Sequence, residues 1–254
     1  MPLEPVDRQY LYCFFRETEP KTFTSKGMGE RGDPVVSLHF RDLGVVVSTS
    51  PEGEYDSSRR NMMNHTKVLE DVMETYTILP VRFNTISPDK PTVYRLLESR
   101  YDELISELDR MDGKIEMGLK ALWFEGIVFD EILAERSDIR QLRDSLQGKP
   151  PEKTYYERIR LGEMVEEAVR QKRLDDEQMI LNALRPHAVE TRTNDIFGDR
   201  MIINAAFLVN RSNEPALDAA IQGLDEQMKL RILFRYVGPV PPYNFVNLVI
   251  RWNR

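Results

Sequence analysis

The amino-acid sequence predicts an α+β fold with two domains and an extended C-terminal tail. Runs of aromatic and β-branched residues near the N-terminus are typical of strands, and apolar residues at helical spacing follow them. The second half of the chain again changes from strand patterns to helix patterns. A length of 254 residues suits two domains, because domains usually contain ~100–150 residues.

The N-terminal α+β domain is expected to cover residues 1–111 and to begin with strands. Short aromatic or β-branched runs that are bounded by charged residues predict these strands. They are expected at residues 9–15, 35–40 and 43–48 and, after the first helix, at residues 81–83.

Helices are expected to complete this domain. Apolar residues at helical spacing predict a helix over residues 61–76, with two serines before it as candidate caps. A second apolar stripe predicts a helical region after Pro91, which suits a first helical turn. The Asp112-Gly113 pair ends that region.

The C-terminal domain is expected to cover residues 112–237 and to have a ferredoxin-like order of elements. Strand patterns lie at residues 114–124, 201–209 and 230–237, an extended polar run lies at 188–193, and helix patterns lie at 125–146, 152–184 and 215–228. The order is β-α-β-β-α-β with one helical insertion. A four-stranded antiparallel sheet with helices on one face is therefore expected.

Residues 238–254 form a Pro-rich, apolar and basic tail. Its prolines forbid a helix and favour an extended arm. The tail either packs on its own domains or engages an acidic or apolar partner surface, and both alternatives can hold for different parts of it. The candidate partner-binding residues are Tyr243, Phe245, Val249, Arg251, Trp252 and Arg254.

The composition excludes several classes of protein. The 35 Lys and Arg residues against 42 Asp and Glu residues give a net charge of −7, which argues against binding to nucleic acid. The single cysteine, Cys13, excludes an internal disulfide and metal sites with two cysteines. Because no secretory signal and no run of the ~20 apolar residues of a membrane-spanning helix are found, the expected compartment is the cytoplasm, without contact to a lipid membrane.

Catalytic motifs are missing from the sequence. It contains neither a Gly-x-Ser-x-Gly nucleophile motif nor a GxxxxGK[ST] phosphate loop. Residues 27–32 satisfy GxGxxG but lead into a strand, so we expect a loop between the first two strands. The acidic run at residues 175–177 is expected to be a solvated helix face. We therefore expect no enzymatic activity, no cofactor and no metal.

Two polar residues lie in apolar surroundings. His65 falls on the inward face of its predicted helix and is expected to be a hydrogen-bonded member of the core. Arg82 is expected to pair with groups near His65 or with Glu70 or Glu74, as a structural ion pair rather than a ligand clamp. The alternative to a protein without catalytic activity is an enzyme or a small-ligand-binding protein that uses a cleft between the two domains.

Several segments, taken in order, resemble the gas vesicle protein F/L family, and F more than L. They are His65 with Leu69, TILPVRFNT (77–85), GKIEMGLK (113–120), YYER followed by LG (155–162), MIINAAFLV (201–209) and YVGPVPPYNFV (236–246). Two positions depart from the family pattern: Asn84 stands where glycine is common, and Val240 stands where tryptophan is common.

The resemblance implies a minor structural or assembly component of gas vesicles, which are gas-filled protein shells inside bacterial cells. It also implies contacts with the apolar shell protein and with other accessory proteins. The expected location is then the gas vesicle.

Overall fold

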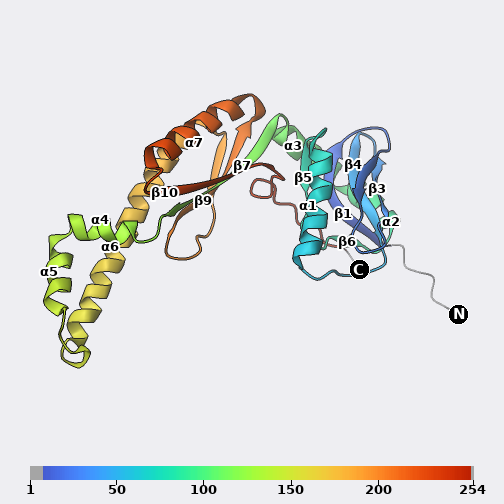
Figure 1. Ribbon diagram of the computed structural model, residues 1–254. Coiled ribbons are helices and arrows are strands. Elements are labelled where there is room, and N and C mark those ends of the chain that lie inside the picture. The colour runs from blue at the N-terminus through green and yellow to red at the C-terminus, as the bar shows by residue number, and fades with distance from the viewer. Residues whose placement is uncertain (1–7, 253–254) are drawn as a thin grey trace. The chain divides into compact units, whose positions relative to one another are not determined.

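The computed structural model describes residues 8–252, and the chain forms two compact units. Unit 1 combines the residues up to Glu116 with those from Pro239 onward, and unit 2 extends from Met117 to Gly238 (Figure 1). The tail thus groups with the N-terminal part of the chain. The domain boundaries expected at residues 111 and 237 were meant for domains that fold independently, and they stay predictions.

A six-stranded sheet forms the centre of unit 1. Its strands are β1 (Arg8–Arg16), β2 (Thr22–Lys26), β3 (Pro34–Phe40), β4 (Leu43–Ser50), β5 (Ile78–Pro80) and β6 (Ile86–Ser87). The order is β2-β3-β4-β1-β5, with β6 also paired to β1, and these pairs are antiparallel. The aromatic run of β1 is buried throughout, which the sequence pattern indicated.

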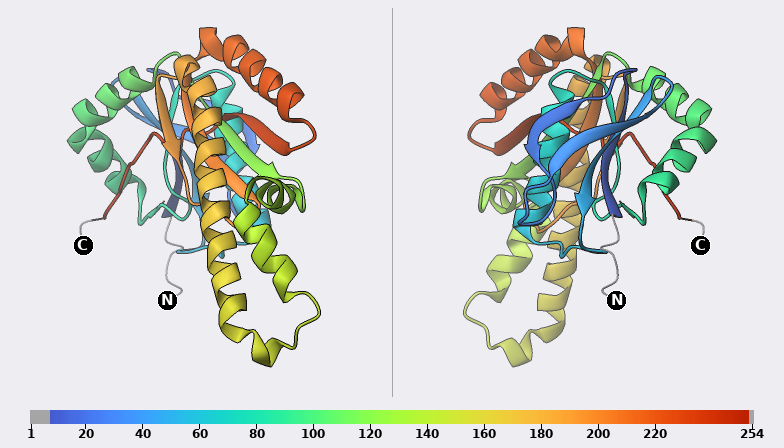
Figure 2. Two further views of the ribbon diagram at one scale, coloured as in Figure 1. Left: turned by 90° about the vertical axis from the view of Figure 1, so that its left-hand side faces the viewer. Right: turned by 90° about the vertical axis from the view of Figure 1, so that its right-hand side faces the viewer.

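Three helices cover this sheet, with α1 on one side and α2 and α3 on the other (Figure 2). They are α1 (Arg59–Met73), α2 (Lys90–Ser99) and α3 (Tyr101–Met111). Ser58 caps α1, since its side chain accepts a hydrogen bond from the Asn61 amide. The helical region after Pro91 is two helices rather than one, because Arg100 leaves the helical conformation.

One strand prediction in unit 1 was wrong, and two strands, β2 and β6, were not predicted. The strand expected at residues 81–83 lies at Ile78–Pro80 instead. Strand β2 was not predicted, because its sequence, TFTSK, is mostly polar. It is held by tertiary contacts: Asp71 of α1 accepts hydrogen bonds from Thr24 Oγ1 at 3.0 Å and from the Ser25 amide at 2.8 Å.

Unit 2 contains a four-stranded sheet of order β10-β7-β9-β8, of which β7 begins in unit 1 and β10 ends there. Its elements are β7 (Lys114–Trp123), α4 (Ile127–Glu135), α5 (Ser137–Leu146), α6 (Tyr155–Leu184), β8 (Glu190–Thr193), β9 (Met201–Asn210), α7 (Glu214–Met228) and β10 (Ile232–Val240). The predicted α+β class is confirmed, and the order of elements is the expected one with added helices.

The helical part of unit 2 differs from the prediction in two places. The helix expected at residues 125–146 is two helices that meet at Arg136. Although residues 174–176 interrupt the apolar pattern of the helix expected at 152–184, α6 runs continuously over 30 residues. Asp176, expected on a solvated face, is buried: its carboxylate accepts from Trp123 Nε1 and from Arg231 Nη1, each at 2.7 Å. These bonds hold the middle of α6 against the sheet.

Among residues 8–252, no helix combines the length and the apolar composition that a membrane span requires.

Candidate partner-binding site

The C-terminal tail turns sharply after two prolines and then runs along unit 1 (Figure 1). The Pro242 carbonyl accepts hydrogen bonds from the amides of Phe245 and Val246, at 3.1 and 3.0 Å. This turn directs Phe245, Val246 and Leu248 into unit 1, where all three are buried. The tail is therefore held both by the burial of these apolar side chains and by the backbone hydrogen bonds of the turn.

Charged side chains of unit 1 fix the first part of the tail. The Glu116 carboxylate accepts from the Asn244 amide at 3.0 Å and from its Nδ2 at 2.6 Å. The Arg110 guanidinium donates to the Phe245 carbonyl at 2.7 Å. Hydrogen bonds to charged groups are stronger than neutral ones, so this segment has a defined position.

Two further arginines contact the later part of the tail. Arg100 donates to the Val249 carbonyl at 3.0 Å, and Arg82 donates to Asn247 Oδ1 at 3.4 Å. Arg82 is exposed, so the contact found is with the tail rather than the ion pair expected with Glu70 or Glu74.

The six candidate residues occupy different environments. Phe245 is 2% exposed and belongs to the core of unit 1, whereas Tyr243 and Val249 are 40% and 47% exposed. Arg251 is exposed and Trp252 is half-buried. Arg254 lies outside the described residues. A role of these residues in partner binding stays a prediction, for which Val249 and Arg251 offer the most accessible side chains.

His65 joins the tail to the core of unit 1. Its Nε2 is hydrogen-bonded to the Tyr243 hydroxyl at 2.7 Å, and its Nδ1 to the Tyr10 hydroxyl at 3.0 Å. Its ring also stacks on Tyr12, with the ring centres 5.6 Å apart. Burial lowers the pKa of His65 to about 4, and a hydrogen bond with the Val81 backbone opposes this shift. The expectation of a hydrogen-bonded core histidine is confirmed.

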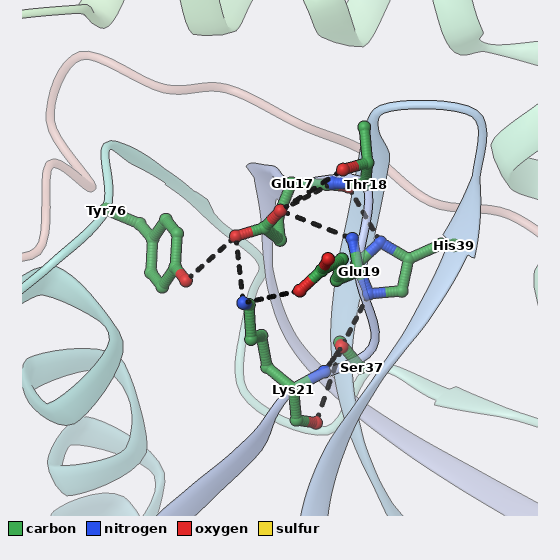
Figure 3. A network of polar contacts seen from close by, with 7 residues as sticks. All are labelled: Glu17, Thr18, Glu19, Lys21, Ser37, His39 and Tyr76. Carbon is green, nitrogen blue, oxygen red and sulfur yellow. Dashed lines mark hydrogen bonds and ion pairs between the residues drawn. The ribbon is translucent and has the colours of Figure 1, made fainter.

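A polar network that the sequence did not indicate surrounds the connection between β1 and β2 (Figure 3). The Glu17 carboxylate accepts from the amides of Thr18 and Glu19 at 2.8 and 3.2 Å, and Lys21 Nζ lies 3.2 Å away. The amides of Glu19 and Thr18, followed by Lys21, lower the pKa of Glu17 to about 2. His39 Nδ1 is hydrogen-bonded to the Glu17 carbonyl at 2.8 Å. These hydrogen bonds and the ion pair hold the Glu17 carboxylate in place and so fix the loop. Because its pKa is low, this carboxylate is a weak base for a proton from a substrate.

The glycine-rich loop at residues 27–32 joins β2 to β3, so it connects two strands, although β2 was not predicted. It borders a pocket of about 550 Å³ whose lining includes Arg31, Glu52 and Arg60. The loop leads into a strand and lacks the strand–turn–helix context of a dinucleotide site. Within the described part of the chain, no group of three or more His, Cys, Asp or Glu side chains is placed to hold a metal ion.

The sequence model of the gas vesicle synthesis protein GvpL/GvpF family matches residues 8–247. The chain belongs to this family. Gas vesicle protein F of Streptomyces sp. (strain CB03234) is 32% identical over 238 residues, which cover 93% of this chain and 98% of that protein. Gas vesicle protein L1 of Halobacterium salinarum is 27% identical over 93% of this chain and 89% of its own length.

Solved structures agree with this assignment. The crystal structure of the gas vesicle protein GvpF from Anabaena sp. PCC7120 superposes with a TM-score of 0.83 at 27% identity, covering 96% of this chain and all of that one. GvpF from Microcystis aeruginosa gives a TM-score of 0.78 at 27% identity, over 95% and 99% of the two chains. The resemblance to the F/L family, and to gas vesicle protein F, is confirmed. The chain has a gas vesicle related role, and its location is the gas vesicle.

Proposed function

We propose that this member of the GvpL/GvpF family helps to build the gas vesicle wall by binding the apolar shell protein and other accessory proteins. It does so as a binding protein rather than as an enzyme. In this proposal, the exposed part of the tail contributes directly to the contact.

One observation carries the role of the tail: it is a firmly anchored segment that still presents side chains to solvent. Phe245, Val246 and Leu248 are buried, while Val249 and Arg251 next to them are exposed. A pre-organised segment binds with a smaller loss of conformational entropy than a free arm. An exposed apolar side chain beside a basic one suits a partner that is apolar with acidic neighbours.

The test is a pull-down of the purified shell protein by full-length chain. Wild-type chain is compared with the double variant Val249→Glu/Arg251→Glu, which changes exposed side chains and keeps the buried anchors. The matched control is Leu230→Glu/Arg235→Glu, an exposed apolar and basic pair in unit 2.

We expect shell protein to be retained by the wild type and by the control but lost from the tail variant. Equal retention by all three proteins would disprove the role of the tail. Failure of the wild type to retain any shell protein would disprove the shell protein as the partner.

A further inference from the structure

The N-terminal half of α6 in unit 2 has a side that the unit does not cover. None of residues 155–167 is buried, whereas Ala168, Asp176 and Ile180 are buried further along the same helix. Helices α4 and α5 pack along this half (Figure 2). Spacing assigns Leu161, Val165 and Ala168 to the packed side.

The other side of α6 carries a regular stripe. Tyr155, Ile159, Gly162, Glu166 and Val169 follow one another at alternating intervals of four and three residues. This spacing places them in one line along a helix, and it is the spacing of a seam between two packed helices. Tyr155 is 62% exposed and Ile159 is 43% exposed. Val169 is half-buried and lines a pocket with Val128 and Phe129 of α4, so the uncovered apolar side chains of the stripe are those of Tyr155 and Ile159.

Gly162 lies at the centre of the stripe. A Cβ atom at this position would meet no atom within 4 Å, so packing inside the unit does not require a glycine. Glycine in an exposed helix interior destabilises the helix relative to alanine. A second helix that crosses closely at this point would explain it, because a residue without a Cβ lets two backbones approach each other.

The charges on either side of Gly162 are opposite. Within the described residues, Arg158, four residues before it, donates to neutral acceptors, Thr154 Oγ1 at 3.0 Å and the Lys149 carbonyl oxygen at 3.3 Å. Glu166, four residues after it, is exposed and forms no ion pair with any residue between positions 8 and 252. An antiparallel copy of the helix that crosses at Gly162 brings Arg158 of each copy opposite Glu166 of the other.

We propose that two copies of the chain associate through an antiparallel contact between their α6 helices, centred on Gly162. The contact is isologous, since the same stripe is used by both copies and is self-complementary in charge. The occupant is a second copy because a two-fold axis at Gly162 places both opposite-charge pairs at the same contact. The proposal does not depend on the role proposed for the tail.

A charge exchange followed by sedimentation of the full chain tests this contact. We expect wild-type chain to be dimeric and the single variants Arg158→Glu and Glu166→Arg to be monomeric, because each creates two like-charge contacts. An equimolar mixture of the two variants restores both opposite-charge contacts and is expected to form a heterodimer. The double variant Arg158→Glu/Glu166→Arg is expected to be a homodimer again.

Glycine replacement gives an independent test. Gly162→Leu is expected to raise the melting temperature of the monomer while abolishing the dimer, since its side chain meets only open space in unit 2. The matched control is Gly223→Leu in α7, where a Cβ likewise meets nothing within 4 Å, and which is expected to leave the dimer intact. A monomeric wild type at concentrations up to its solubility limit overturns the proposal. So does a dimer that survives both single charge variants, or a mixture of them that stays monomeric.

Discussion

His65 Nε2 lies 2.7 Å from the hydroxyl of Tyr243, so a helix near the N-terminus is hydrogen-bonded to a residue 178 positions later in the chain. The Asn84 amide donates to the Tyr10 hydroxyl at 3.1 Å, and that hydroxyl is in turn 3.0 Å from His65 Nδ1. We infer that Tyr10 donates to Nδ1 and that the proton on Nε2 is donated to Tyr243. The tail is thereby part of the hydrogen-bonded core of unit 1.

Removal of the Tyr243 hydroxyl is expected to loosen the tail. Tyr243→Phe keeps the ring stacked on His65 but leaves the buried Nε2 without this partner. An unsatisfied buried donor costs about 1–3 kcal/mol. Urea unfolding measures the loss, and Tyr156→Phe, at an exposed tyrosine on α6, is the control with no expected change. An unchanged free energy of unfolding in Tyr243→Phe would contradict this function of the hydroxyl.

The stability of unit 1 is expected to fall as the pH drops from 6.5 to 4 because of His65. Burial lowers the pKa of His65 from 6.5 to about 4. In this window the unfolded chain takes up a proton that the folded chain does not, so the stability present above pH 6.5 is lost on acidification. The difference corresponds to roughly 3 kcal/mol.

Urea unfolding of the wild type and of His65→Gln across this pH window measures that contribution. The variant has no titrating group at position 65, so its free energy of unfolding is expected to depend less steeply on pH. Parallel pH profiles for the two proteins would show that His65 does not carry the effect.

Asn84 is expected to tolerate glycine better than alanine. Its φ of +65° lies in the left-handed region, and its side chain bonds the Tyr55 backbone at 2.9 and 2.6 Å. Asn84→Gly loses these bonds at a cost of about 1 kcal/mol. Asn84→Ala loses them and adds backbone strain of about 1 kcal/mol or more. Melting temperatures in the order wild type, glycine variant, alanine variant are expected, and a more stable alanine variant would refute the argument.

Two neighbouring aspartates on α6 are expected to behave differently. Asp176 is buried between Trp123 Nε1 and Arg231, whereas Asp175 is exposed. Asp176→Ala leaves the indole N–H and one guanidinium N–H without their acceptor and is expected to cost about 3 kcal/mol. Asp175→Ala is expected to stay within about 0.5 kcal/mol of the wild type. Thermal unfolding compares the two, and equal losses would show that the buried contacts contribute little.

The spacing of apolar residues along the chain predicted those strands and helices whose own sequence carries a clear pattern. The buried aromatic run of β1 and the apolar stripe of α7 give clear local patterns, and the strand and helix formed there. Strand β2 has a polar sequence and is held by Asp71 of another element, so no local pattern predicted it. Asp176 reads as a surface residue until Trp123 and Arg231, far away in sequence, are placed beside it.

The candidate site was predictable only in outline. The prolines and apolar residues of the tail indicated an extended segment, and the segment is extended and partly buried. Which residues face inward depends on the Pro242 turn and on acceptors and donors such as Glu116 and Arg110. Contacts of this kind join positions more than a hundred residues apart, so spacing along the chain does not predict them.

The most direct test of the proposed function is gas vesicle formation in cells that lack the natural protein and are supplied with a variant. Electron microscopy counts the vesicles in cells that produce the wild type, Val249→Glu/Arg251→Glu, or the control Leu230→Glu/Arg235→Glu at equal levels. We expect normal vesicle numbers with the wild type and the control, and few or no vesicles with the tail variant. Normal vesicle numbers with the tail variant would contradict the account.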